Sequence, residues 1–431
     1  MPSNQALILN IVIWGLTLIL FYRRRKPIDS AVFLLSTFFI FSVCSYLIYN
    51  VPYGGFRGER ITLLPLLYLY VMIMLTMSPI LRFNIQKIET FPDPPFKVLD
   101  ILVWGFIICM IIKLPSDLMR IQDGISTIML DQGRELYSDV MNESRINGGA
   151  YIISSLPTIY TNLTTEIILL IAFYNFYKKR KKKLTTVVLI ALAFTPFSSL
   201  ANGQRGGAFD VIIIAIGTYF LFAPLLENKI RRIAKITGIV FLVGVLVPTV
   251  ALTKSRFGSS DNFVLNSVYS YMGQQNLNFD IYAFDNNGLR YGDRVFPLFK
   301  KMLGFEDVPD DFWQRRKKYP NLKINDEVFI GYIGDFLLDF GPWISTILFI
   351  VFTSIFLSLT KLRHRKCEFY QLLVIQFVLT LGLQGGLKLY PFADTFGLKI
   401  FSFGLLYIYL KLYKQNKLNH RIVLPNSKAI L

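Results

Sequence analysis

The chain has 431 residues, of which 53% are hydrophobic and 17% charged, and its mean hydropathy is +0.46. Many apolar runs reach the ~20 residues that a helix needs to cross a bilayer, and they do not alternate with polar residues. This pattern excludes a soluble globular protein and a transmembrane β-barrel. A formal net charge of +18 would suggest nucleic acid in a soluble protein. Here much of that charge lies at alternate span ends, so we predict an all-α polytopic membrane protein with no nucleic-acid partner.

The apolar runs predict about eleven transmembrane helices in one transmembrane domain, residues 1–431. In chain order, the predicted spans are Gln5–Tyr22, Ala31–Tyr49, Ile61–Leu81, Val98–Ile112, one within Ala150–Tyr177, Leu184–Leu200, Ala208–Leu226, Ile236–Leu252, one from the Gly331 region to before Lys361, Phe369–Gly386 and Phe392–Tyr413. Basic runs mark cytoplasmic ends, above all Lys178–Lys183. We therefore expect the N-terminus outside and the C-terminus in the cytoplasm.

Two external segments precede the fifth predicted span. The first, Val51–Arg60, is rich in glycine, which permits close approach of the backbone to a ligand, and it carries Arg57 and Arg60. An interfacial loop in which one of these arginines pairs with Glu59 is an equal alternative. The second, residues 113–147, has an apolar side and is expected to be an amphipathic helix lying on the membrane, with or without a chemical role.

Two sequence features bear on charge inside the membrane and on metals. Glu166 lies in the fifth span, where a carboxylate is expensive to bury, so it is either a site residue or the structural partner of a neighbouring helix. The three cysteines and two histidines are dispersed and give no disulfide framework or metal-ligand spacing. Nucleotide-binding and hydrolase motifs are absent from the sequence. We expect neither a metal nor a cofactor.

The stretch from Ser198 to Tyr219 joins the sixth and seventh spans through the turn Asn202–Gly207. Basic anchors on both sides place this turn outside, so Arg205 is predicted to lie at the outer membrane surface between two helix ends. The alternative is an ordinary helix–helix turn with an arginine that snorkels to the interface.

A long external segment, residues 253–329, follows the eighth span. It is polar, aromatic and basic, with Arg256 and Arg290 among its cations. Its length far exceeds that of a connector, which indicates a functional loop. The ninth span then begins near Gly331 and carries Asp335 and Asp339, four residues apart and therefore on one helical face.

Arginines at several external helix ends indicate a binding site for an anion, because a guanidinium group can bond two phosphate oxygens at once. A lipid-linked diphosphate fits, since its tail would stay in the bilayer while the diphosphate lies at the interface. If the reaction is glycosyl transfer, the arginines would stabilise the departing diphosphate. The acceptor hydroxyl would need a carboxylate as base, and Glu327, Asp326, Asp335 and Asp339 are the nearest candidates. Helix capping is the alternative role for Asp335 and Asp339.

These features resemble the Wzy-type oligosaccharide repeat-unit polymerases of O-antigen and capsule synthesis. The resemblance rests on the element Asn202–Gly207 between two spans, the long external segment before the late spans, and Gly331–Gly341 at a span start. It implies a C-type membrane glycosyltransferase in the bacterial inner membrane. Such an enzyme moves a glycan from an undecaprenyl-diphosphate carrier to the next carrier-linked unit, with inversion and without a metal.

The resemblance also implies roles for particular residues. Arg205 is the position that best matches the Gly-Arg-Gly element of the family, while Arg256 and Arg290 fit less closely its habit of placing arginine in the large loop. A membrane protein that determines chain length is an expected partner. The related O-antigen ligases use an external histidine, which this topology does not provide, so polymerase is favoured over ligase. The alternative from another class is a flippase for the same lipid-linked units, which predicts charges inside the bundle and short external loops.

Overall fold

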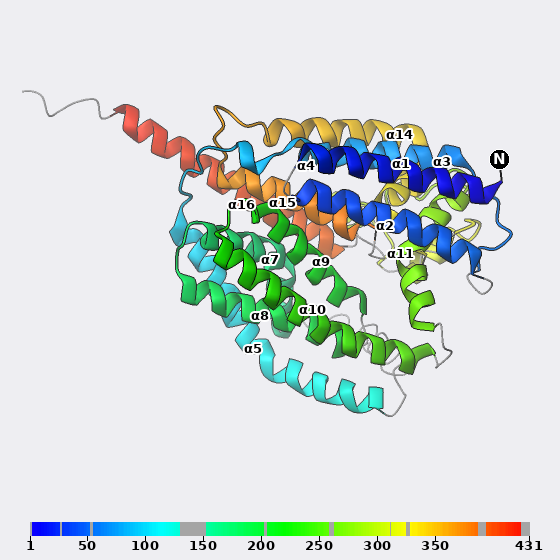
Figure 1. Ribbon diagram of the computed structural model, residues 1–431, viewed down its shortest axis with the longest axis horizontal. Helices are drawn as coiled ribbons and strands as arrows, with labels where there is room; N and C mark the ends of the chain where they lie inside the picture. Colours follow the sequence, from blue (N-terminus) through cyan, green and yellow to red (C-terminus); the bar gives the residue numbers. More distant parts are fainter. Residues whose placement is uncertain are drawn as a thin grey trace, which may run out of the picture.

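The computed structural model describes residues 2–25, 28–51, 55–129, 152–201, 205–257, 263–310, 312–324, 328–386 and 394–423. Within these ranges the chain is helical, and its β-type pairing is limited to isolated bridges such as Thr90 with Lys366. Figure 1 shows the long helices side by side in one bundle, with the N-terminus at the right and α16 running out to the left.

The helices are α1 (Ser3–Arg24), α2 (Ser30–Asn50), α3 (Leu63–Thr76), α4 (Ser78–Arg82), the 3-10 turn η1 (Ile85–Lys87), α5 (Phe96–Met129), α7 (Ile152–Tyr177), α8 (Lys182–Ala201), α9 (Arg205–Phe222), α10 (Asn228–Phe257), α11 (Phe263–Tyr282), α12 (Pro297–Met302), α13 (Phe312–Lys318), α14 (Gly331–Leu359), α15 (Phe369–Gln384) and α16 (Asp394–Val423).

Seven helices of the described ranges are long and apolar enough to cross a membrane, namely α1, α2, α5, α7, α8, α10 and α14. Three shorter apolar helices, α3, α9 and α15, lie among them, and α16 covers the last predicted span. Each of the eleven predicted spans therefore falls on a helix. The prediction of an all-α, multi-pass membrane protein is confirmed, and a lipid bilayer is its environment.

Aromatic side chains make many of the contacts between neighbouring helices. Trp14 of α1 stacks on Phe38 of α2, with ring centroids 5.2 Å apart, and Phe377 of α15 meets Phe403 of α16 edge to face at 5.3 Å. In lipid, helix association depends on such close packing rather than on removal of apolar surface from water. Each aromatic pair contributes about 0.5–1.5 kcal/mol beyond its buried area.

Three of the loops predicted to be cytoplasmic meet at one end of the bundle. The loop after α4 is joined to the end of α7 by Lys178 and Asp93, 2.8 Å apart, and to the turn before α15 by Arg365 and Glu89, 2.6 Å apart. The contacts fit the predicted grouping of basic span ends on one side. Which side of the membrane this is stays a prediction.

The segment predicted as a long external loop, residues 253–329, is largely structured in its described part. It contains the end of α10, the 20-residue helix α11 and the short helices α12 and α13. The segment 113–147 begins as a continuation of α5 up to Met129 rather than as a separate helix, and its residues from 130 onward lie outside the described ranges.

Helix α11 packs closely against α2. The α-carbon of Gly273 lies so near α2 that an added β-carbon would meet the Cys44 carbonyl oxygen at 2.5 Å. The Ser45 hydroxyl donates to the Gly273 carbonyl oxygen at 2.8 Å, and the Asn276 amide donates to Ser45 at 3.0 Å. Close approach with polar bonds across the contact is how helices associate in the absence of a hydrophobic drive. These contacts fix a polar helix of the external segment onto a transmembrane helix.

Helix α14 is broken near its start. Gly341 has φ of 72° and ψ of 173°, a conformation that an L side chain resists, and Pro342 follows with no N–H to donate. The Ser345 hydroxyl donates to the Phe336 carbonyl oxygen at 2.8 Å across the break. The first ten residues of α14 are thus set apart from the long apolar remainder.

Candidate functional site

The break in α14 frees two carbonyl oxygens, and the loop before α12 takes both. Pro342 cannot donate to the Leu338 carbonyl four residues earlier, and the backbone N–H of Arg290 donates to that oxygen instead, at 3.1 Å. The N–H of Tyr291 likewise donates to the Asp339 carbonyl oxygen at 3.0 Å. The loop is therefore attached to the helix by its backbone, and this attachment positions the charged side chains described next.

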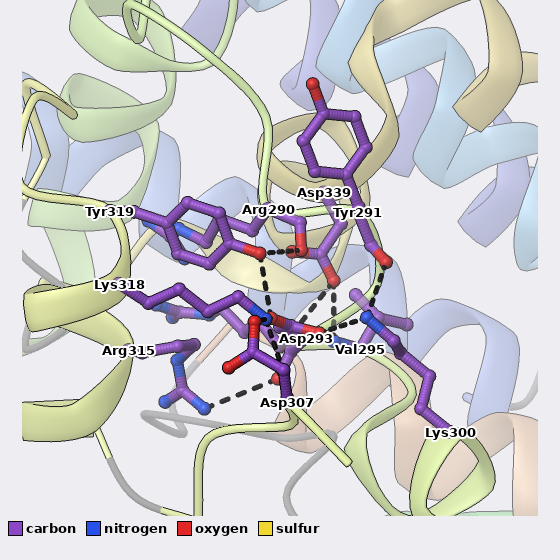
Figure 2. Close-up of polar contacts among 11 residues, drawn as sticks. Arg290, Tyr291, Asp293, Val295, Lys300, Asp307, Arg315, Lys318, Tyr319 and Asp339 are labelled. Carbon is purple, nitrogen blue, oxygen red and sulfur yellow. Dashed lines mark hydrogen bonds and ion pairs between the residues drawn. The ribbon is translucent and has the colours of Figure 1, made fainter. Parts of the chain in front are cut away.

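Those side chains form a largely buried group that we call the loop–helix cluster, and Figure 2 shows the part of it around Asp293 and Asp339. It comprises Arg290, Asp293, Arg294, Lys300, Asp307, Arg315, Lys318, Tyr319, Asp335 and Asp339.

Asp339 of α14 binds the backbone of the loop through its carboxylate. Its Oδ2 accepts the backbone N–H groups of Arg294, at 3.1 Å, and Val295, at 2.7 Å. The side chain is fully buried, and the guanidinium groups of Arg290 and Arg294 lie close enough to interact with its charge. Burial of a carboxyl group is costly, and the two backbone N–H groups and the two neighbouring cations offset part of that cost.

Arg294 and Asp335 form the second link. The guanidinium Nε lies 2.5 Å from Oδ1 of Asp335, and the two side chains are 2% and 1% exposed. Taking both ions out of water costs several kcal/mol each, so an ion pair at such burial depends on close geometry and on further charges nearby.

Asp293 is the centre of the third part and is fully buried. Lys318 lies 2.9 Å from its Oδ2, the Tyr319 hydroxyl donates to the same oxygen at 2.7 Å, and Lys300 bonds Oδ1. Burial by itself would raise the pKa of Asp293, but the bonds from these three side chains outweigh it and hold the pKa below its usual value.

Two further groups close this part of the cluster. The Tyr319 hydroxyl also lies 3.0 Å from the Arg290 carbonyl oxygen, and burial together with the Asp293 charge raises the pKa of the phenol. Arg315 donates to the Asp293 carbonyl oxygen at 3.4 Å. Lys318 pairs with Asp307 as well, at 2.8 Å. The cluster thus combines five cations with four carboxylates, so its formal charge is slightly positive.

The structure brings three of the predicted residues together, namely Arg290, Asp335 and Asp339. All three are buried, with Arg290 only 1% exposed. The aspartates do not cap α14, whose first residue is Gly331 and whose start shows no side-chain cap bond. In this conformation the two aspartates of α14 and the arginine of the loop hold the loop and the helix together, and all three are shielded from solvent.

Other predicted residues lie apart from the cluster. Arg57 and Arg60 are exposed, in the turn before α3. Arg205 and Arg256 lie at the start of α9 and near the end of α10, and their side chains lie outside what the structure describes, as does the whole of Glu327.

The start of α9 and the start of α14 both contact α11. At Gly206, next to Arg205, an added β-carbon would lie 2.7 Å from the Tyr271 hydroxyl, so the backbones are close there. Tyr271 also contacts Phe329, with ring centroids 5.1 Å apart. Phe329 lies two residues before Gly331, the first residue of α14. The backbone that carries Arg205 is therefore placed by the same helix as the segment that leads into Asp335.

The turn that carries Arg57 and Arg60 is also held by α11. The Asp280 carboxylate accepts the backbone N–H of Thr62 through Oδ1, at 3.0 Å, and Oδ2, at 3.1 Å. Burial raises the pKa of Asp280 to about 7, against the lowering effect of the Thr62 bonds. Helix α11 thus contacts each of three predicted external parts: the turn before α3, the start of α9 and the start of α14.

A separate ion pair lies within the bundle, and it involves Glu166. Lys399 of α16 lies 2.5 Å from Oε1 of Glu166 in α7, and the two side chains are 12% and 2% exposed. The Ser402 hydroxyl lies 3.4 Å from the Leu163 carbonyl oxygen along the same contact. The structural partner considered for Glu166 is therefore Lys399, and the pair joins α7 to α16.

Arg294 and Asp293 were not among the site residues predicted from the sequence. The signal was present, because Arg290 and Arg294 are spaced four apart, as are Asp335 and Asp339. Matching pairs of opposite charge at one spacing could have indicated mutual binding. Within the described ranges, no group of histidine, cysteine or acidic residues could hold a metal ion.

Comparisons with known proteins give no relative for this chain: no family model, curated protein or solved structure matches it.

Proposed function

We propose that the protein is a membrane glycosyltransferase that polymerises undecaprenyl-diphosphate-linked repeat units into a surface polysaccharide. The single observation that carries the proposal is the position of the loop–helix cluster at the start of α14. The loops that carry Lys178 and Arg365 meet beyond the other end of that apolar helix, at what we call the basic end of the bundle. A lipid with a diphosphate head and a long apolar tail matches that distribution of charge.

The predicted arginines fall into two groups, those assigned to diphosphate binding and the buried Arg290. Arg57 and Arg60 are exposed and free to meet an anion, and Arg205 starts a helix whose N-terminal end favours negative charge. We assign the diphosphate to these residues and Arg256. Arg290 is buried, and we give it a positioning role, in which it helps Asp339 to hold the loop.

The transfer step needs the acceptor hydroxyl to lose its proton. The hydroxyl oxygen bonds to the anomeric carbon, the bond from that carbon to the diphosphate oxygen breaks, and its electron pair leaves with the diphosphate. Arginines would stabilise the negative charge of the leaving group without a metal. Asp335 and Asp339 are buried and engaged with the loop. We therefore assign to Glu327, a few residues before α14, the role of the base that accepts the proton of the acceptor hydroxyl.

A direct test uses the purified full-length chain with synthetic lipid-linked repeat units, with and without a chelator, and sizes the products on a gel. The expected result is a ladder in both conditions. Arg205→Ala is expected to abolish the ladder, and Arg205→Lys to weaken it at least tenfold because a lysine cannot bond two phosphate oxygens in a fixed plane. Glu327→Gln is expected to slow transfer by about 100-fold or more, the usual range for a lost general base.

The matched control is Arg365→Ala, which removes an exposed arginine at the other end of the bundle, where it pairs with Glu89. This variant should form a normal ladder. Absence of a ladder from competent substrate, or a normal ladder from Arg205→Ala, would reject the proposal.

The flippase alternative has one observation in its favour, the charged pair Glu166–Lys399 inside the bundle. Reconstituted vesicles separate the two functions. A flippase would move a labelled lipid-linked unit between leaflets without lengthening it, whereas a polymerase would lengthen units that are already present in one leaflet.

A further inference from the structure

A cleft opens at the basic end of the bundle, between α4 and the end of α14. Its volume is about 600 Å³, and its lining comes from two short stretches of chain. The lining residues are Pro79, Arg82, Phe83, Leu357, Ser358, Thr360, Lys361 and Leu362. None of them belongs to the loop–helix cluster or to any residue assigned above.

The charge of this cleft has one sign. Arg82 and Lys361 are both exposed, no carboxylate is among the lining residues, and within the described part of the chain neither cation forms an ion pair. Other basic residues at this end of the bundle do form ion pairs, Arg365 with Glu89 and Lys178 with Asp93. Two cations of unlike geometry, one a planar fork and one a point charge, face the same opening and favour an anion such as a phosphate.

The remaining lining fits a lipid better than a free anion. Half of the lining residues are apolar, and the cleft lies directly below an apolar stripe on α14. The stripe is formed by Ile347, Val351 and Ile355, all exposed and spaced four apart, so they lie on one face of the helix. Three residues further on, that face reaches Ser358 in the cleft. Acyl chains could lie along the stripe with the phosphate between the two cations.

We propose that this cleft is a binding site for the headgroup of an anionic phospholipid, such as phosphatidylglycerol or cardiolipin. Arg82 and Lys361 bind the phosphate, the hydroxyl of Ser358 lies beside it, and the apolar stripe of α14 receives the acyl chains. Basic pockets between transmembrane helices recognise such headgroups in this way. The proposal is independent of the proposed function, because it uses none of the same residues.

The test is native mass spectrometry of the delipidated full-length chain, mixed with equal amounts of phosphatidylglycerol and phosphatidylcholine that share the same acyl chains. The first lipid adduct is expected to be phosphatidylglycerol by about tenfold or more, since each cation near an anionic lipid is worth about a fivefold preference. Arg82→Gln with Lys361→Gln should bring that ratio close to one. Arg82→Lys with Lys361→Arg should keep most of the preference, which shows that the site needs charge and that the chain still folds.

The matched control is Arg363→Gln with Lys366→Gln, which removes two exposed cations of the same end that do not line the cleft. The preference should be retained. Equal binding of the two lipids by the unaltered chain would overturn the proposal, as would the same loss in the control as in the cleft variant. Displacement of bound phosphatidylglycerol by millimolar inorganic phosphate would overturn it too, because the site would then bind a free anion.

Discussion

Arg294 and Asp335 join the loop before α12 to the first turns of α14 through an ion pair that is almost fully buried, with 2.5 Å between Nε and Oδ1. One partner comes from the loop before α12 and the other from a helix that begins some forty residues later. The pair therefore links the segment that we expect to act on substrate to a helix of the membrane bundle.

Removal of one partner of this pair should destabilise the protein strongly. Asp335→Leu leaves Arg294 buried and without its partner, which costs about 3–5 kcal/mol. The combined variant Asp335→Leu, Arg294→Met should recover most of that loss, because two apolar side chains replace two buried ions. Thermal unfolding in detergent, compared across the two single variants and the double variant, measures the coupling. A double variant no more stable than the single ones would contradict this account.

Gly341→Ala should destabilise the kink in α14. The residue has φ of 72°, which an alanine adopts only at a cost of about 1–2 kcal/mol. The attachment of Arg290 and Tyr291 to the helix should weaken with it, so proteolysis between α11 and α13 should become faster. Gly244→Ala in α10 is the matched control: it is a helical glycine with open space around it, where alanine should be neutral or stabilising. Equal effects of the two substitutions would mean that the kink is not strained.

The contribution of Asp280 to the stability of the protein should fall as the pH rises. Burial raises the pKa of this carboxyl to about 7, from about 3.9 in the unfolded chain. The folded state therefore binds more protons between those values, so the contribution of Asp280 to stability is highest below about pH 4 and declines up to about pH 7. The slope for one group is at most about 1.4 kcal/mol per pH unit. Asp280→Asn, which cannot titrate, should lack this part of the slope when unfolding is followed at pH 5, 6 and 7. An unchanged slope in the variant would show that other groups cause it.

Glu166 and Lys399 should depend on each other. Glu166→Leu leaves an ammonium group inside the bundle, and we expect a loss of a few kcal/mol and a lower folded yield. The exchange of both residues, Glu166→Lys with Lys399→Glu, should restore part of the loss, because the pair is then reversed but present. Folded yield by size-exclusion chromatography is the measurement. If the exchanged variant is as poor as Glu166→Leu, the ion pair is not what joins α7 to α16.

The membrane fold could be predicted well from the sequence, because a bilayer restricts a chain to helices of nearly fixed length. The eleven predicted spans fall on helices, and the basic runs such as Lys178–Lys183 lie at helix ends. What the sequence did not indicate is α11. This helix is too polar for its pattern to resemble a span, and its place against α2 depends on the close approach at Gly273 and on the bonds that Ser45 forms there.

The site was predictable in its residues more than in their relation. Arg290, Asp335 and Asp339 were identified, but a chain pattern does not say that a break at Pro342 would release the Leu338 carbonyl to the loop. Burial is also decided by packing, so the change of Arg290 from a surface cation to a fully buried one could not be deduced from spacing. Asp293 was missed because its partners, Lys300 and Lys318, are distributed over two short helices.

The kink at Gly341 divides α14 into two helical segments. The segment before the kink carries Asp335 and Asp339, which bind the loop. The segment after the kink bears the exposed apolar stripe of Ile347, Val351 and Ile355. The loop is therefore bonded to the segment before the kink, and the exposed apolar surface belongs to the segment after it.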